Sequence, residues 1–365
     1  MQNGNFKKRE TPLFQDILKE CYADFEESLG KGSGYFKQID KYKGRNREAY
    51  DALASLYKTN NFLKVTPQEE PKIPKVIHQI WIGDREMPQT YKDYRKSWIK
   101  HHPDWEIKLW TNKEVNEYKF SDKYLNELCS KELTIGEMVD ILRYDILYTL
   151  GGLYVDCDCF CLKPHDVLHH CYDFYAGIFP PFFSSAKSAI NISNGMIGSK
   201  KNHPIFPILT KYLYDNWDNV KGSEDDVYTT LKHTFTCLTE PVIEGAGRDN
   251  NVDIVLPTGY FFPLTPYPLF DIIIRGPIRC IIDFITKRAG PFSSIKPYSF
   301  SVHHSGKEWM HDIYSTINLK NFLWLVFTPR DWKLLIKSKF FKKKGQQKKT
   351  RMSFKEMLND KHEGG

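Results

Sequence analysis

Apolar residues recur at helical spacing along the first part of the chain, and the pattern then changes to that of strands. Two amphipathic helices are predicted over residues 9–29 and 47–63, separated by the glycine-rich stretch KGSG. A polar linker with prolines, TPQEEPKIP, leads into the continuous apolar run KVIHQIWIG, which is typical of a buried strand. A helix around 90–100 and a short strand, WEIKLW, follow. Alternating strands and helices predict an α/β fold with a parallel sheet.

The best-defined helix is predicted over about 135–150. Thr134 and Glu137 have the spacing of a capping box, and Gly151 is a natural stop. Between them the apolar residues keep helical spacing: Ile135, Met138, Val139, Leu142, Ile146 and Leu150. Asp140 and Arg143 lie three residues apart and share one face of this helix. They form either a surface ion pair, worth under about 1 kcal/mol, or part of a site.

Two carboxylates, Asp156 and Asp158, end the next apolar run in GGLYVDCDCF. On a strand they would share one face, about 6.6 Å apart, and the cysteines would take the other face. Like charges this close repel, and a divalent cation with oxygen ligands, Mg²⁺ or Mn²⁺, would neutralise them. In open α/β sheets, ligands bind beyond the carboxyl ends of the strands. The alternative is that both aspartates are solvated loop residues.

Composition predicts a soluble protein. The chain has 365 residues with 41% hydrophobic content, enough for one large domain or two. Its start, MQNGNFKKRETP, lacks the apolar segment of a secretory signal, so we expect a cytoplasmic protein. The eight cysteines show no pattern of disulfides or zinc ligands, which favours reduced, buried thiols.

The net charge of +7 is concentrated near the end of the chain. Residues 330–351 carry ten Lys or Arg and one Asp, a local charge of +9 that leaves −2 for the rest. Aromatic and aliphatic residues are mixed with these lysines, which suits a segment lying on anionic lipid at the inner face of the membrane. A solvated tail and a docked terminal helix are the alternatives. Nucleic acid is not expected as a partner.

Three blocks, in order, carry a resemblance: IPKVIHQIWIG, W..HHPDWEIKLW and D..RY.ILY..GGLYVDCD. They resemble the DxD sugar-transferase family, glycosyltransferase family 32, which includes initiating mannosyltransferases and bacterial capsule enzymes. The resemblance spans residues 73–309 and extends more distantly to the glucosylating domain of clostridial toxins. It implies an A-type glycosyltransferase fold, Rossmann-like, over 71–315. Helices over 1–70 and the basic amphipathic tail over 316–365 would be additions.

The resemblance also implies roles for single residues. Trp81 would stack on the nucleotide base, which suits a flat aromatic ring. Asp140 and Arg143 would hold the donor sugar and take part in catalysis. Asp156 and Asp158 would bind the metal that bridges the donor diphosphate, with Asp158 also catalytic. Two further residues, His78 and Tyr154, would line the donor pocket.

Downstream the match is looser. In SVHHSGKEW, His304 is our choice for a further metal or diphosphate contact, with His303 as the alternate. Lys307 would contact the diphosphate, Trp309 would bind substrate, and Glu308 replaces the serine usual in the family; an ordinary surface loop is the alternative. The stretch NISNGMIGSKKNHP fits the family's strand near the acceptor side, which makes Asn194 a catalytic candidate near the sugar or else a buried amide. Glu240 stands where the family commonly has glycine, a departure on the acceptor side.

The function expected from the resemblance is a retaining, metal-dependent transfer of a hexose from a UDP- or GDP-sugar to a glycan or lipid-linked acceptor, with Mn²⁺ or Mg²⁺ as cofactor. A second hypothesis is an effector that glycosylates a protein, which the toxin resemblance permits. A third is a non-catalytic module that binds nucleotide-sugars or glycans. The carboxylates and Arg143 argue against the third, because a binding module has no need of a leaving-group metal.

Overall fold

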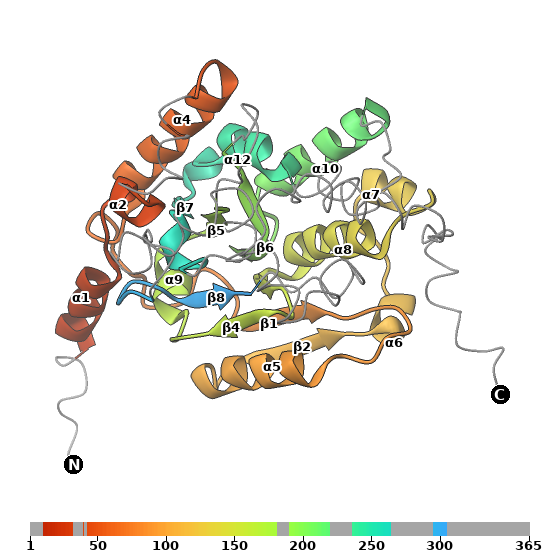
Figure 1. Cartoon of the computed structure of the whole chain (residues 1–365), viewed down its shortest axis with the longest axis horizontal. Helices are drawn as coiled ribbons and strands as arrows, with labels where there is room; N and C mark the ends of the chain where they lie inside the picture. Colours follow the sequence, from red (N-terminus) through yellow and green to blue (C-terminus); the bar gives the residue numbers. More distant parts are fainter. Residues whose placement is uncertain are drawn as a thin grey trace, which may run out of the picture.

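The computed structural model describes residues 10–31, 39, 42–180, 190–219, 236–263 and 295–304. Its centre is a six-stranded sheet in the order β2-β1-β3-β6-β5-β7 (Figure 1). The strands are β1 (Val76–Ile80), β2 (Glu106–Trp110), β3 (Gly152–Val155), β5 (Phe174–Ile178), β6 (Ile192–Ser199) and β7 (Asp253–Leu256).

The sheet is mixed rather than wholly parallel. β1 runs parallel to β2 and β3, and β5 runs parallel to β7, whereas β6 is antiparallel to both of its neighbours. Apolar runs do not reveal this reversal, because a strand buried on both faces reads as a continuous apolar run in either direction. The predicted α/β fold class is confirmed.

Helices cover both sides of the sheet. In Figure 1, α5 (Gln89–His101) and α8 (Ile135–Leu150) lie on opposite sides of β1 and β2. Further helices after β2 are α6 (Asn112–Asn116), α7 (Lys123–Leu128), α9 (Asp166–Cys171), α10 (Ile205–Asn216) and α12 (Thr239–Gly245). The prediction for α8 is confirmed: both bonds of the Thr134–Glu137 capping box form, and the helix ends at Gly151 with φ 66°.

The N-terminal helices pack on this sheet. The predicted first helix is divided into α1 (Glu10–Cys21) and α2 (Phe25–Leu29), and the second is α4 (Arg45–Asn60). The Tyr57 and Tyr260 hydroxyls are 2.8 Å apart and donate to the carbonyls of Ala23 and Cys21. Apolar residues of these helices join the same core as the strands. The domain limits given above stay a prediction.

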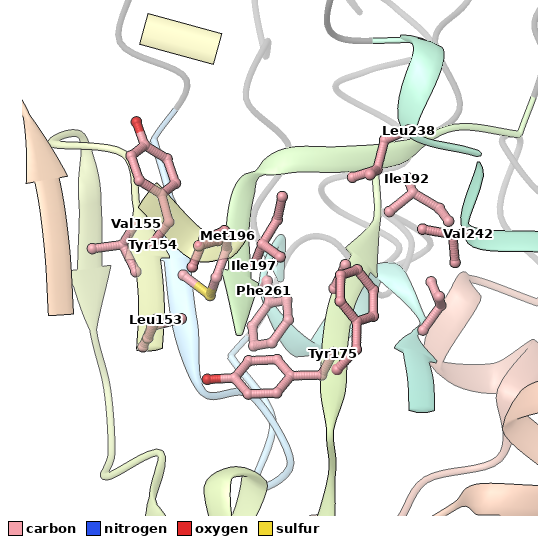
Figure 2. Packing of buried hydrophobic residues seen from close by; sticks show 14 of the residues in the cluster. Leu153, Tyr154, Val155, Tyr175, Ile192, Met196, Ile197, Leu238, Val242 and Phe261 are labelled. Atoms are coloured by element: carbon pink, nitrogen blue, oxygen red, sulfur yellow. The ribbon is translucent and has the colours of Figure 1, made fainter. Parts of the chain in front are cut away.

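A second sheet of two strands lies beside the first. β4 (Cys159–Cys161) pairs antiparallel with β8 (Ser301–His303), and Cys159 faces His303 across the pair. Figure 2 shows the neighbouring core, where Leu153, Tyr154 and Val155 of β3 lie beside β6. This small sheet brings a segment far along the chain next to the end of β3.

Two predictions made from composition can be compared with the described residues. The seven cysteines among them are all buried and form no disulfide with one another, as predicted. No helix in the described ranges is long and apolar enough to span a membrane. Lys307, Glu308, Trp309 and the basic tail lie outside the described residues.

Candidate active site

The α8 helix holds an ion pair inside the protein, not on its surface. An Arg143 nitrogen, Nη2, lies 2.7 Å from Asp140 Oδ1, and the two side chains are only 4% and 7% exposed. Both project from a helix that packs on β3 and β6. Because both side chains are buried, the surface ion pair is excluded. A buried ion pair needs further hydrogen bonds to offset the free-energy cost of desolvating its charges.

Arg143 obtains those further contacts from three other segments. Its Nη1 donates to the Asn194 carbonyl over 2.6 Å, and its Nη2 lies 3.3 Å from Asp156 Oδ1. The guanidinium carbon sits 4.2 Å from the centre of the Tyr154 ring, a cation–π contact. The Tyr154 hydroxyl in turn donates to Asp156 over 2.8 Å. Arg143 therefore connects α8, β3 and β6 at one point.

The two aspartates lie in a turn rather than on a strand. β3 ends at Val155, and the Asp156 carbonyl accepts a hydrogen bond from the amide of Cys159 over 3.0 Å. The predicted strand alternation therefore does not apply to Asp158. The turn is anchored to β6, because the Asp156 amide donates to the Gly195 carbonyl over 2.9 Å.

Gly195 is a site residue that the sequence analysis missed. A Cβ at this position would lie 2.6 Å from Asp156 Oδ2 and 2.8 Å from His303 Nε2. The missing side chain thus leaves room where these two groups meet. A glycine within a buried strand is the signal that could have found it, since such glycines often mark a close approach.

His303, the alternate, is the histidine that meets the aspartates. Its Nε2 lies 3.2 Å from Asp156 Oδ2 and 3.6 Å from Asp158 Oδ1. The His304 ring stacks instead on Tyr94, with centroids 4.6 Å apart and planes 15° apart. Successive side chains of an extended segment point to opposite sides, so only one of the two histidines can face the turn. His303, the alternate, is therefore the histidine that faces the turn, and the metal or diphosphate contact of either residue stays a prediction.

The charges at the turn compensate one another. Burial alone would raise the pKa of Asp156, but the charges of Arg143 and His303 more than offset it, so the pKa is lowered. Burial alone would lower the pKa of His303, but Asp158 and Asp156 more than offset it, so the pKa is raised. A protonated His303 therefore compensates the two carboxylates in the absence of another cation.

The same side chains fit a divalent cation. Ligand atoms of Asp158, Cys159 and His303 all lie within 4.8 Å of one another, and Asp156 Oδ2 is next to His303. Carboxylate oxygens suit Mg²⁺ and Mn²⁺, and imidazole nitrogen is a common ligand of transition metals. Burial raises the pKa of the Cys159 thiol well above its usual range. Thiolates suit softer metals than Mg²⁺ or Mn²⁺, which leaves the two carboxylates and the imidazole as the candidate ligands.

Trp81 lies at the end of β1, half-buried, as predicted. Its Nε1 donates to the Arg85 carbonyl over 2.7 Å, and its ring meets the Tyr91 ring edge-on at 5.9 Å. One side of the indole is thus fixed by α5 and one edge by its own loop.

His78 lies inside the packing of the sheet, and its predicted contact with substrate stays a prediction. The ring is 1% exposed. Its Nδ1 accepts from Trp110 over 3.2 Å, and its Nε2 lies 2.9 Å from the Gly151 carbonyl. Burial lowers the pKa of His78 to about 4, so the ring is neutral and both nitrogens are in use. It ties β1 to β2 and to the start of β3.

Asn194 is both a buried amide and a neighbour of Arg143. Its side-chain Nδ2 donates to the Tyr144 hydroxyl over 3.0 Å, and that hydroxyl also hydrogen-bonds the Cys237 thiol. Glu240 pairs with Arg45 and ties α12 to α4, so it takes a structural role.

Comparison with known proteins gives the family. Residues 36–252, more than half of the chain, match the family model described as "Capsular polysaccharide synthesis protein". The chain belongs to this family. The match includes α4, which the sequence resemblance placed outside, and it covers Asp140, Arg143, Asp156 and Asp158.

Relatives agree with this assignment. The chain is 34% identical to inositol phosphoceramide mannosyltransferase 3 of Schizosaccharomyces pombe over 41% of this chain and 40% of that protein. It is 32% identical to an uncharacterized glycosyltransferase of Acanthamoeba polyphaga mimivirus over 44% of this chain and 62% of that protein. The match thus spans well under half the length of the yeast relative.

Among solved structures, the PaToxG glycosyltransferase has 18% identity and a TM-score of 0.36, over 59% of this chain and 82% of that one. The family match and the names of the relatives confirm the resemblance to sugar transferases.

Proposed function

We propose that this chain is a metal-dependent, retaining glycosyltransferase that moves a hexose from a nucleotide-sugar to a glycan or lipid-linked acceptor. The observation that supports it best is the meeting of Arg143, Asp156, Asp158 and His303 at the end of β3, next to Asp140. A charged, largely buried cluster at the carboxyl end of a strand is where open α/β sheets bind ligands.

In this proposal the chain's own groups divide the donor between them. Asp140 accepts a hydrogen bond from a sugar hydroxyl, and Arg143, held rigid by its contacts with three segments, donates one. Asn194 donates its Nδ2 to Tyr144, which leaves its amide oxygen to accept from the sugar. Tyr154 holds Arg143 through its ring and Asp156 through its hydroxyl. Trp81 stacks on the nucleotide base.

Asp156, Asp158 and His303 would hold Mn²⁺ or Mg²⁺. When bound, the cation supplies charge stabilisation for the nucleoside diphosphate that leaves. His303 has a second task, because its proton must leave before the ring can act as a ligand. Cation binding should therefore release protons at a pH where His303 is still charged.

The acceptor class rests on the family and on the relatives. The family is described as "Capsular polysaccharide synthesis protein", and the S. pombe relative is named an inositol phosphoceramide mannosyltransferase. We propose a glycan or glycolipid acceptor, reached at the inner face of the membrane through the basic tail. Deleting residues 321–365 should release the protein from anionic vesicles and reduce transfer to a lipid-linked acceptor, while transfer to a short soluble acceptor persists.

The test is a melting-temperature panel of UDP- and GDP-sugars with and without Mn²⁺. A ligand at 100 times its dissociation constant adds about 2.7 kcal/mol of stability, so the true donor should raise the melting temperature measurably. Because the proposed site needs the cation to hold the diphosphate, this rise should occur only with metal. Asp158→Asn should lose this shift, and Asp16→Asn, an exposed aspartate on α1, should keep it. A shift in no member of the panel, or one that is independent of Asp158, would overturn the proposal.

A further inference from the structure

The α5 helix supports the candidate metal turn from behind. Ser97 Oγ accepts from the Cys161 amide over 2.9 Å, and Trp98 Nε1 donates to the Cys159 carbonyl over 2.8 Å. These two bonds fix β4 directly after the turn. A further partner of the turn is the end of β8, where His303 is the last residue of the strand and His304 follows it.

Tyr94, one helical turn before Trp98, meets that end of β8. Its ring lies parallel to the exposed His304 ring, 4.6 Å away, and its edge meets Phe160 of β4 at 5.9 Å. The His304 amide donates to the Asp158 carbonyl over 3.1 Å, which extends the β4–β8 pairing by one residue. His304 is thus held by its ring and by its backbone.

The same aromatic contacts continue to Trp81. Tyr94 stacks on Tyr91 at 6.1 Å with planes 27° apart, and Tyr91 meets Trp81 edge-on at 5.9 Å. The row Trp81–Tyr91–Tyr94–His304 therefore joins the proposed base-binding ring to the residue that follows His303.

From this row we infer that Tyr94 is a positioning residue: by stacking on His304 it fixes the end of β8 and keeps the His303 imidazole directed at Asp156 and Asp158. The inference rests on the proposed function, since it concerns the same cation site. A side chain on β8 can face the turn only while its neighbour faces away. Holding His304 on α5 therefore sets the side to which His303 points.

The tyrosine hydroxyl is not needed for this task. Burial, and next the charge of Asp158, raises the pKa of the Tyr94 phenol, so it stays protonated at neutral pH. Tyr94→Phe keeps the stacking ring and is the matched control for Tyr94→Leu. His304→Phe likewise keeps a ring for Tyr94, whereas His304→Ala removes it.

The test measures Mn²⁺ affinity of the full chain by the electron paramagnetic resonance signal of free Mn²⁺, with GDP or UDP present in separate titrations. We expect Tyr94→Leu and His304→Ala to bind Mn²⁺ about tenfold more weakly, as the loss of one aromatic contact predicts. Tyr94→Phe and His304→Phe should remain within about twofold of the wild type. Melting temperatures without Mn²⁺ separate a general loss of stability from the loss of affinity.

Three results would overturn the inference. If His304→Phe is as weak as His304→Ala, His304 is itself a ligand. If Tyr94→Leu melts earlier but binds Mn²⁺ as the wild type does, Tyr94 has a structural role alone. If the wild type shows no binding that depends on Asp158, the proposed function fails and this inference fails with it.

Discussion

In the described part of the chain, two groups of side chains each bring three possible metal-ligating atoms within 4.8 Å of one another. The surroundings of the two groups differ. One is His102, Cys161 and His165; the other is Asp158, Cys159 and His303. The first group is packed among aromatic rings, with Trp98 5.1 Å from the His165 ring. The second contains one carboxylate and lies beside another.

This difference reverses the behaviour of the histidines. Burial lowers the pKa of His102 and His165, with no nearby carboxylate strong enough to offset it. At His303 the two aspartates outweigh burial, and the pKa is raised. His102 is also fully used, since its Nδ1 faces the Trp98 carbonyl at 3.0 Å and its Nε2 accepts from the His165 amide. Carboxylates, rather than the spacing of histidine and cysteine, distinguish a cation site from a packed core.

The largest expected effect comes from removing one carboxylate. Asp158→Asn keeps the volume but loses the charge, so transfer in the presence of Mn²⁺ should fall by about 100-fold to 1,000-fold, the range seen when one group that stabilises developing charge is lost. Folding should survive, as judged by circular dichroism.

The matched change in the other group is His165→Phe, which keeps an aromatic ring. It should leave Mn²⁺ affinity unchanged. Near-normal turnover of Asp158→Asn with Mn²⁺, or loss of Mn²⁺ binding in His165→Phe, would contradict the distinction between the two groups.

Arg143→Lys comes next. It keeps the positive charge but loses the planar set of donors that reaches Asp140, the Asn194 carbonyl and Asp156. We expect kcat/KM to fall by about 100-fold, with a much smaller change in the urea midpoint. Arg45→Lys, an exposed pair with Glu240, is the control and should change neither. Equal losses of activity and stability in Arg143→Lys would indicate a structural ion pair.

Gly195→Ala should have a smaller effect. The added methyl would lie 2.6 Å from Asp156 Oδ2, so the carboxylate must shift. We expect Mn²⁺ affinity to fall by about tenfold, the lower end of the range for displaced outer-shell groups. Titration calorimetry with Mn²⁺ measures it, and unchanged affinity would show that the ligands do not meet at this glycine.

The last prediction concerns stability rather than activity or Mn²⁺ binding, and it tests the buried histidines His102, His165 and His169. Because His102, His165 and His169 stay neutral when folded, the unfolded chain alone takes up their protons below the ordinary histidine pKa of 6.5. The free energy of unfolding should therefore fall as pH drops below about 6.5, by up to about 1.4 kcal/mol per pH unit for each histidine.

His303 acts in the opposite sense: its raised pKa stabilises the fold at low pH, and this contribution is lost as pH rises through the folded value. Urea unfolding between pH 7.5 and 5.5 measures the sum. His165→Phe should make the slope shallower and His303→Phe should make it steeper. The same slope in both variants would contradict the assignment.

Several features of the site could be read from the chain alone. The limits of α8 followed from its capping box and Gly151, and the pairing of Asp140 with Arg143 followed from helical spacing. The two aspartates at the end of a strand predicted the candidate cation site, which stays a proposal. Each of these depends on residues close in the sequence, where local geometry fixes the spacing.

The remaining features depended on contacts between distant segments. The sequence by itself determined which side chains α8 and the turn after β3 present. Only the tertiary structure decided that His303 rather than His304 faces them, that Gly195 gives them room, and that His78 serves packing. The physical reason is that strand pairing between β4 and β8 spans over 140 residues, and the side to which each side chain points is set by that register.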